Sequence, residues 1–344
     1  MKRILFYSST QDKRMFSIQS FYQNDIRILK DLGYEVILSN RLRDFLRFSK
    51  YDDAFIYFYR YGLFGALIAK IARKRVFFTG GIDYMDKNFA NRRQRFIQRL
   101  FFRLCYRLSN KCFVVSTSDM ANIRQMYSHQ PVKCVVCPHV IDVHSLQYSP
   151  EKQKKKKQFL TMAWMGATDN VYRKGVDRAI YIFEIIHKRY PEYTLYIAGP
   201  GGRGSALVES IIWEKHLEDS IKLLGAVSEE EKNQLMLESA YYFQISTYEG
   251  FGIAAAEALA ANCMVIHSGR GGLADAVGSH GLLVEDIDDF EAAAQLIMDD
   301  MQYDNDENRR KRQQNGALYV AENFAYSRRL GDFRTHIGDA HDNR

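Results

Sequence analysis

The segment STYEGFGIAAAEALAANCMVIHSGRGG, residues Ser246–Gly272, carries two glutamates, Glu249 and Glu257, in a run that is otherwise mostly small or apolar. It divides into a strand end, a glycine-containing loop, the helical pattern IAAAEALAA and a second short apolar run, CMVIHS. This order indicates a parallel strand–helix–strand unit. The stretch therefore predicts an α/β fold and raises the question of what its two carboxylates do.

Short apolar runs alternate with longer helical patterns along the whole chain, which is typical of parallel sheets with crossover helices. The strand candidates are RILFYS, YEVILS, DAFIYFY, RVFFTGG, KCFVVS and KCVVCP in the first half, and FLTMAWMG, YTLYIAGPGG, IKLLGAV, AYYFQIS, CMVIHS and GLLVE in the second. We therefore expect two Rossmann-like, doubly wound domains. Ligands bind beyond the carboxyl ends of the strands in such sheets, so we expect the site in a cleft between the two domains.

The balance of charge changes along the chain and predicts a domain boundary. Residues 1–150 contain 25 Lys and Arg against 11 Asp and Glu, whereas residues 151–344 contain 23 against 30. The change coincides with YSPEKQKKKKQF, a lysine-rich run without apolar periodicity, which is typical of a solvated linker. We expect an N-terminal domain over 1–148, a linker over 149–157 and a C-terminal domain over 158–322.

Composition narrows the class of protein further. The chain has 344 residues, of which 47% are hydrophobic, enough for one or two buried cores. No run reaches roughly 18 apolar residues, and the N-terminal apolar run is too short for a signal peptide, so we expect a cytoplasmic protein. Five cysteines do not indicate a disulfide framework, and Cys134 and Cys137 would point to opposite faces of a strand, so no metal site is expected.

The start of the helix after Glu249 has the properties of an anion site. Neither Phe251 nor Gly252, just before Ile253, can cap the helix with a side-chain oxygen, so its first N–H groups stay free. Free N–H groups and the positive end of the helix dipole favour a phosphate. Glu257 lies about one turn further on and requires a partner. The alternative is that Glu249 only complements the dipole and Glu257 reaches solvent.

Basic and glycine-rich loops elsewhere in the second half support a phosphate ligand. MGATDNVYRKGVDRAI places Arg173 and Lys174 on an expected strand-to-helix loop, and such a cationic pair suits a diphosphate, although solvated surface residues are the alternative. IAGPGGRG contains a GxGxxG pattern, which alone is a weak indication of NAD binding. Glu218 and Asp219 precede the next strand instead of ending it, so we interpret this loop as one near a nucleotide.

The motif EGFGIAAAEA resembles the E-G-F-G-x-x-x-x-E-A pattern of glycosyltransferase family four, a group of retaining enzymes with the GT-B fold. The similarity continues through NCMVIHSGRGGLADAV and GLLVEDIDDFEAAAQLI, so residues 158–322 resemble the nucleotide-sugar domain of that family. The resemblance implies that Glu257 holds the ribose hydroxyls and Glu249 contacts the transferring sugar. It also implies two domains facing each other across a cleft.

Further roles follow from the same resemblance. Lys174 would neutralise the diphosphate leaving group with Arg173 beside it, while the backbones of Gly201 and Val227 would lie near the base. A nucleoside-diphosphate sugar, with UDP or GDP as the nucleotide, would be the donor, and no cofactor or metal would be needed. The final helix, residues 324–340, would return to pack on the first domain.

The first domain departs from the family pattern on the acceptor side. Where a cleft histidine is common, FFTGGIDYMDKN provides Asp83, which would orient an acceptor or donor sugar or would simply follow a glycine turn. Ala167 stands where the family often has arginine, so either Arg173 would take over that role or the affinity for the diphosphate would be lower. A non-catalytic nucleotide-sugar-binding partner subunit and a nicotinamide oxidoreductase remain alternatives to a glycosyltransferase.

A basic amphipathic helix is expected over residues 91–111, which contain seven basic residues and no acidic one. Its arginine stripe is Arg92, Arg95, Arg99, Arg103 and Arg107, and its apolar side is Phe96, Leu100, Leu104 and Leu108, widened by Ile97, Phe101 and Phe102. Such a helix favours docking on an anionic membrane face and an acceptor carried on a lipid, as in bacterial surface polysaccharide synthesis. The alternative is a surface helix whose apolar face is core; nucleic acid is not expected because no recognised motif accompanies the charge.

Overall fold

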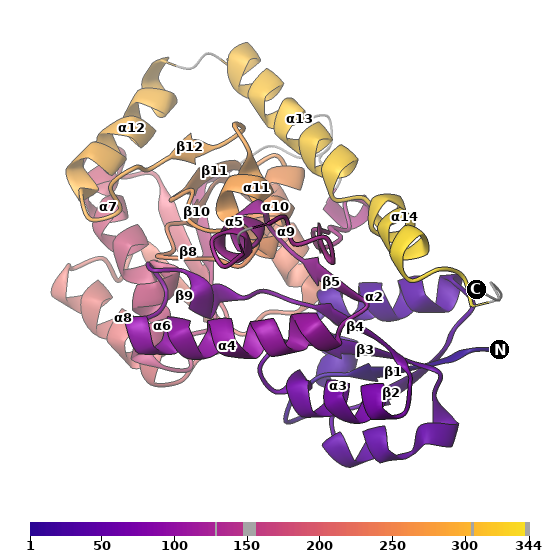
Figure 1. Cartoon of the computed structure of the whole chain (residues 1–344). Helices are drawn as coiled ribbons and strands as arrows, with labels where there is room; N and C mark the ends of the chain where they lie inside the picture. Colours follow the sequence, from indigo (N-terminus) through magenta and orange to yellow (C-terminus); the bar gives the residue numbers. More distant parts are fainter. Residues whose placement is uncertain (128, 147–155, 304–305, 341–344) are drawn as a thin grey trace. The chain divides into compact units, whose positions relative to one another are not determined.

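The computed structural model describes residues 1–344 apart from 128, 147–155, 304–305 and 341–344. The chain forms two compact units, one of Met1–Val140 with Phe324–Arg344 and one of Ile141–Asn323 (Figure 1). Most of the expected linker, 149–155, lies outside the described residues, whereas Lys156 and Lys157 already belong to a strand of the second unit.

The first unit is built on a six-stranded parallel sheet in the order β2-β1-β3-β4-β5-β6. Its strands are β1 (Arg3–Tyr7), β2 (Glu35–Ser39), β3 (Asp53–Tyr57), β4 (Arg75–Thr79), β5 (Lys111–Val114) and β6 (Cys134–Val136). The connecting helices are α1 (Met15–Ile18), α2 (Ser20–Asp31), η1 (Leu42–Leu46), η2 (Phe48–Lys50), α3 (Gly62–Ile71), η3 (Asp83–Met85), α4 (Arg92–Leu108) and α5 (Thr117–Arg124). All six strands predicted for this half are confirmed.

The second unit holds another six-stranded parallel sheet, in the order β12-β11-β10-β7-β8-β9. Its strands are β7 (Lys156–Met162), β8 (Thr194–Ala198), β9 (Ile221–Gly225), β10 (Ser239–Gln244), β11 (Met264–His267) and β12 (Leu282–Leu283). Its helices are η4 (His144–Leu146), α6 (Thr168–Lys174), α7 (Val176–Arg189), α8 (Arg203–Glu214), α9 (Glu229–Glu238), α10 (Ile253–Ala260), α11 (Leu273–Val277), α12 (Phe290–Tyr303) and α13 (Asp306–Asn323). The strand predictions for this half are confirmed as well.

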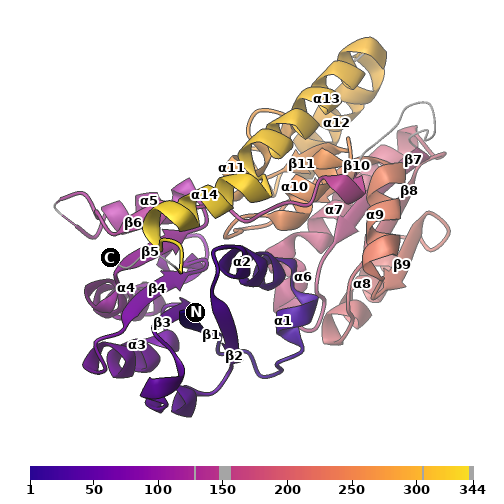
Figure 2. The same ribbon diagram turned by 90° about the vertical axis from the view of Figure 1, so that its right-hand side faces the viewer.

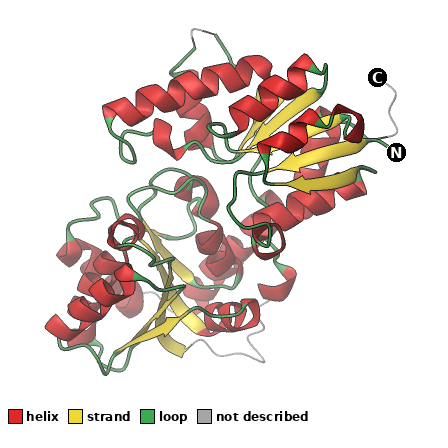
Figure 3. Cartoon of the chain, turned by 90° about the horizontal axis from the view of Figure 1, so that it is seen from below, coloured by secondary structure: helices red, strands yellow, loops and turns green. Residues whose placement is uncertain are grey.

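Helices cover both faces of each sheet, as Figures 2 and 3 show, and this explains the continuous apolar runs of the strands. Every residue of β3 is buried, for example. Aromatic rings fill the layer between sheet and helices: Phe159 on β7 stacks on Tyr241 and Phe243 of β10 at 4.9 and 5.1 Å. Parallel strands buried on both sides place all the loops after their carboxyl ends at one edge.

The last helix, α14 (Tyr326–His336), packs against α2 within the first unit. Arg329, which is 2% exposed, donates to Asp25 with an Nε–Oδ1 distance of 2.6 Å. Asp25 also accepts from the hydroxyl of Tyr57, and Arg329 donates to the carbonyl of Pro138 at 2.9 Å. The charged pair is therefore hydrogen-bonded on several sides, which compensates the cost of burying it.

Helix α4 begins after Asn91, whose side chain forms a capping box with Gln94. The apolar side of this helix is only partly buried. The side chains that it buries are those of Gln98, Phe102 and Cys105. Phe96, Leu100 and Leu104 are exposed, by 70%, 47% and 37%. The alternative that the apolar side of this helix is core is therefore right for Phe102 and in part for Leu108, which packs against the core, but wrong for the exposed Phe96, Leu100 and Leu104. Among the helices that the structure describes, none is both long and apolar enough to cross a bilayer.

Candidate functional site

The expected basic pair lies at the end of a short helix and not, as predicted, on a strand-to-helix loop. Arg173 and Lys174 form the last turn of α6, which ends at Gly175. Gly175 has φ +72°, and a Cβ on it would come within 2.0 Å of the carbonyl oxygen of Ile245. A glycine is needed here because the chain must turn left-handed while touching the end of β10. This contact brings Lys174 beside the loop that carries Glu249.

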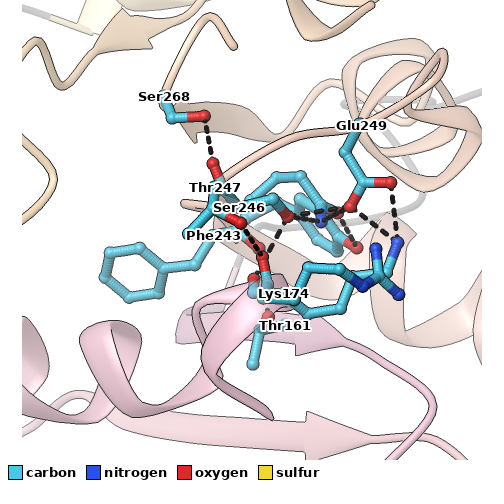
Figure 4. A network of polar contacts seen from close by, with 10 residues as sticks. Thr161, Lys174, Phe243, Ser246, Thr247, Glu249 and Ser268 are labelled. Atoms are coloured by element: carbon cyan, nitrogen blue, oxygen red, sulfur yellow. Dashed lines mark hydrogen bonds and ion pairs between the residues drawn. The ribbon is translucent and has the colours of Figure 1, made fainter. Parts of the chain in front are cut away.

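Glu249 is held by a buried network (Figure 4). Its carboxylate accepts from Nζ of Lys174 at 2.6 and 2.7 Å, from Oγ of Ser246 at 2.8 Å and from Nε2 of Gln244 at 3.1 Å. The side chains of Glu249 and Lys174 are only 10% and 24% exposed. Glu249 therefore does more than complement the dipole of α10. The pair fixes one ammonium and one carboxylate at the carboxyl edge of the sheet.

Glu257 has its own lysine, which comes from a different helix. Its Oε1 lies 3.0 Å from Nζ of Lys232 on α9, and Lys232 also contacts Glu229 at 2.7 Å. Burial raises the pKa of Glu257 above the ordinary 4.5, and Lys232 opposes that rise. Burial lowers the pKa of Lys232, but the adjacent Glu257 and Glu229 carboxylates raise it by more. The alternative in which Glu257 reaches solvent is wrong, because its side chain is only 13% exposed.

Tyr242 on β10 lies near both glutamates. Burial raises the pKa of the Tyr242 hydroxyl, and the negative charges of Glu257 and Glu249 raise it further. The hydroxyl donates to Oε1 of Gln244 at 3.2 Å, and Gln244 in turn donates to Glu249. Each carboxylate thus approaches the end of β10 and is balanced by a lysine of its own. The seven-residue spacing places one glutamate on the loop and the other on the helix that follows.

The start of α10 has the uncapped geometry that the sequence predicts. Gly252 is the N-cap residue with φ +102°, and no side chain caps the helix. A Cβ on Gly252 would meet Cδ2 of Leu273 at 2.6 Å, so the loop is closely packed. Phe251 is 4% exposed, whereas Ile253 is half-buried. The amide of Gly272 donates to the carbonyl of Glu249 at 2.7 Å, which joins the loops after β10 and β11.

The positions expected near a nucleotide base lie on neighbouring loops of the same edge. Gly201 is exposed between β8 and α8, and Val227 is half-buried between β9 and α9. Val227 precedes the capping box in which Oγ of Ser228 accepts from the amide of Glu231 at 3.2 Å. Both positions offer backbone groups, as the resemblance requires. Their roles remain predictions.

Asp83 is the one predicted site residue that lies in the first unit. It is the half-buried first residue of η3 and follows the turn at Gly80, which has φ +113°. Its proposed action on a sugar remains a prediction.

Three polar residues of the network escaped sequence reasoning. Gln244 and Ser246 stand at alternate positions at the end of a buried strand, and two polar groups with that period are a usable signal. Lys232 follows three glutamates on the helix that begins at the capping box of Ser228 and Glu231. The alternation of the sequence could have revealed the first two, whereas the contact of Lys232 with Glu257 depends on tertiary packing.

Replacing Lys232 with methionine should destabilise the second unit in a pH-dependent way. Removing one partner of a largely buried pair costs about 3 kcal/mol. Without the lysine, the pKa of Glu257 rises further in the folded state. In the variant, the carboxyl group of Glu257 therefore holds its proton more tightly in the folded state than in the unfolded state. The loss in the free energy of unfolding relative to wild type should be small near pH 4.5. It should grow as the pH rises through the raised pKa of Glu257. Urea unfolding by tryptophan fluorescence reports this unit, because both tryptophans, Trp164 and Trp213, lie in it.

The matched control for this experiment is Lys222→Met, which removes an exposed lysine. The double variant Lys232→Met/Glu257→Gln should recover part of the loss and abolish its pH dependence. Equal stability of Lys232→Met and Lys222→Met at pH 8 would show that the pair is not a coupled buried unit.

Part of the chain is similar to a known protein family. Residues 148–318 match the family model of glycosyl transferases group 1. The fold is similar to that of Anabaena Alr3699/HepE, solved with UDP and glucose, with a TM-score of 0.75, 16% identity, and 98% of this chain and 99% of that chain covered. Sucrose-phosphate synthase from Thermosynechococcus elongatus gives a TM-score of 0.73 and 16% identity over 97% and 98% of the two chains.

Among curated proteins, the gpi3 subunit of phosphatidylinositol N-acetylglucosaminyltransferase from Schizosaccharomyces pombe is 28% identical over 44% of this chain and 32% of its own length. The GDP-mannose:cellobiosyl-diphosphopolyprenol alpha-mannosyltransferase of Xanthomonas oryzae is 35% identical over 28% of this chain and 25% of its own. The matches span about a third or less of these relatives. Residues 148–318, about half of the chain, therefore belong to the glycosyl transferases group 1 family, and the chain with its two parallel sheets has the GT-B glycosyltransferase fold.

Proposed function

We propose that the protein transfers a sugar from a nucleoside-diphosphate sugar to a hydroxyl of a glycan or glycolipid, with retention of the anomeric configuration. The observation that carries this proposal is the pair of buried Lys–Glu contacts, Lys174–Glu249 and Lys232–Glu257, beside an uncapped helix start. This arrangement lies inside the segment that matches the family. It combines positive charge for phosphates with carboxylates for hydroxyl groups.

The diphosphate of the donor would lie against Lys174, Arg173 and the N-terminus of α10. These groups would stabilise the negative charge that develops on the leaving nucleoside diphosphate as an oxocarbenium-like centre forms at the sugar. Such stabilisation requires little rearrangement, since Lys174 is already held by Glu249. Holding donor and acceptor in contact would supply much of the remaining rate enhancement. No step of this mechanism requires a metal ion.

The carboxylates would recognise hydroxyl groups of the donor. Glu257 would accept hydrogen bonds from the ribose, and Lys232 supports this role because it opposes the effect of burial and favours the ionised form. Glu249 would contact the transferring sugar and the adjacent charge. Gly201, Val227 and the backbone from Phe251 to Ile253 would line the nucleotide. Asp83 would act from the first unit on the acceptor or the sugar.

The relatives support a nucleotide sugar as donor and a phosphorylated lipid as carrier of the acceptor. HepE was crystallised with UDP and UDP-glucose, and the Xanthomonas relative is named for GDP-mannose, which favours UDP or GDP as the nucleotide. The names of two relatives include phosphatidylinositol and a diphosphopolyprenol. We therefore propose a lipid-linked acceptor, a place in bacterial cell-surface polysaccharide synthesis, and attachment of a cytoplasmic enzyme to the inner membrane face.

A non-catalytic partner subunit is the second candidate. The relative from Schizosaccharomyces pombe is named as a subunit, which favours this possibility. A partner subunit would bind the nucleotide sugar without turnover when assayed alone. Product formation by the purified chain would exclude it.

The variants Glu257→Ala and Lys174→Ala should each lose most transfer activity. Each removes a charged contact to the donor, which contributes about 1.5 to 3 kcal/mol. Activity is measured as release of nucleoside diphosphate, after tryptophan fluorescence confirms that each variant is folded. The controls Glu209→Ala and Lys188→Ala remove exposed charges of the same unit and should retain wild-type rates. Wild-type rates in the folded Glu257 or Lys174 variant would refute the donor-site assignment.

The glycosidic linkage of the product should keep the configuration of the donor. The proposed mechanism places the leaving diphosphate and the incoming hydroxyl on the same face of the sugar, and its positive charge comes from side chains. NMR of the product made from an α-linked donor should show an α linkage, with or without a chelator. A β product would contradict the retaining assignment.

A further inference from the structure

Exposed apolar side chains gather on three neighbouring elements of the first unit. Helix α3 packs against both η1 and α4, and Figure 1 shows α3 and α4 as adjacent helices. The exposed apolar residues of these elements and their flanks are Leu42, Leu46, Phe48, Tyr61, Phe64, Leu67, Ile71, Phe96, Leu100 and Leu104. We call this set the apolar face. Single exposed apolar residues are ordinary, but a group on adjacent elements marks an interaction surface.

Helix α3 is the centre of the apolar face because Lys70 is its only polar residue. Its inner side is packed closely, as a Cβ on Gly65 would lie 2.5 Å from the ring of Phe45. Its outer side carries Phe64, Leu67 and Ile71, which are 59%, 46% and 73% exposed. A helix with apolar residues on both its inner and outer sides is normally buried on both of them. The outer side of α3 therefore has the composition of a surface that is buried against a binding partner.

The charge around the apolar face is almost entirely positive. The segments 41–50, 60–74 and 91–108 contain fourteen Lys and Arg and one acid, Asp44. Asp44 is engaged locally, since it accepts from Oγ of Ser39 at 2.7 Å. Protein interfaces are depleted of charge at their centres, whereas apolar groups ringed by lysine and arginine suit the boundary between anionic headgroups and acyl chains. Charge complementarity thus favours a lipid surface as the occupant.

A pocket of about 480 Å³ opens among the same elements. Leu42, Tyr61, Phe64 and Phe101 provide apolar walls, and Arg60 and Asn40 provide polar groups. Walls that are mostly apolar with a few polar groups are typical of small-ligand sites. The guanidinium of Arg60 lies 5.7 Å from the ring centre of Tyr61, and in the described part of the chain it forms no salt bridge. It is thus available to a phosphate.

We propose that the apolar face and this pocket form one lipid-binding site. The side chains of the apolar face enter the headgroup boundary of an anionic bilayer, and the pocket receives the phosphate-bearing head of one lipid. The identification of that lipid as the acceptor rests on the proposed function, whereas the binding itself does not. The site extends beyond the arginine stripe of α4 because α3 and η1 contribute apolar groups to it.

Vesicle flotation tests the apolar face with a matched pair of variants. Ile71→Glu places a charge on the apolar face. The control, Ile18→Glu, changes an isoleucine of the same unit that lies outside the apolar face and is 58% exposed. With vesicles of phosphatidylcholine and phosphatidylglycerol, Ile71→Glu should lower the bound fraction at least about tenfold, and Ile18→Glu should bind as wild type. Wild-type binding should weaken as salt shortens the Debye length, yet some should persist in about 1 M salt. Complete loss in salt, or equal binding by both variants, would overturn insertion of the face.

Calorimetric titration with dihexanoyl phosphatidic acid below its micelle concentration tests the pocket. This soluble lipid should bind at least about tenfold more tightly than inorganic phosphate, because it also buries acyl carbons. Arg60→Ala should weaken its binding at least about tenfold, whereas Arg124→Ala, on α5, should not. No binding by wild type, or equal affinity of the lipid and inorganic phosphate, would overturn the lipid pocket. Neither experiment involves the nucleotide-sugar donor. A negative result would therefore overturn the lipid-binding site without bearing on the proposed transfer reaction.

Discussion

The ion pair between Lys174 and Glu249 is the interaction on which the candidate donor site depends. It joins the end of α6 to the loop after β10, which are 75 residues apart in sequence. The backbone of Glu249 in turn holds the loop after β11 through the amide of Gly272. Because both charges are largely buried, each requires the other, and the three segments share one geometry before a ligand arrives. A site organised in this way stabilises developing charge with little rearrangement.

The sequence revealed the fold and one part of the site for the same physical reason. Strands buried on both faces are continuous apolar runs, so runs such as DAFIY and YYFQI predicted the two sheets that the structure contains. The absence of a capping side chain before Ile253 was visible in the residue types themselves, and the structure has Gly252 as an uncapped left-handed N-cap. Features fixed by local residue type and by period can be inferred without coordinates.

Features that depend on which helix face meets the sheet could not be inferred. The sequence showed an apolar stripe on α4, but the helix buries Phe102 and leaves Phe96 exposed. Nothing in the sequence around Lys232 indicates that α9 packs against α10, where this lysine balances Glu257. The pocket with Arg60 likewise combines residues from separate elements. Such contacts arise from the packing of elements far apart in sequence, which periodicity does not encode.

The central claim is that the second unit binds a nucleoside diphosphate through the two Lys–Glu pairs. The most direct test is thermal unfolding, followed by the two tryptophans of that unit, with UDP, GDP, ADP and NAD compared in parallel. UDP or GDP at about 100 times its dissociation constant should stabilise the fold by about 2.7 kcal/mol, and Lys174→Ala should lose most of this gain. Stabilisation by NAD with none from UDP or GDP would contradict the account.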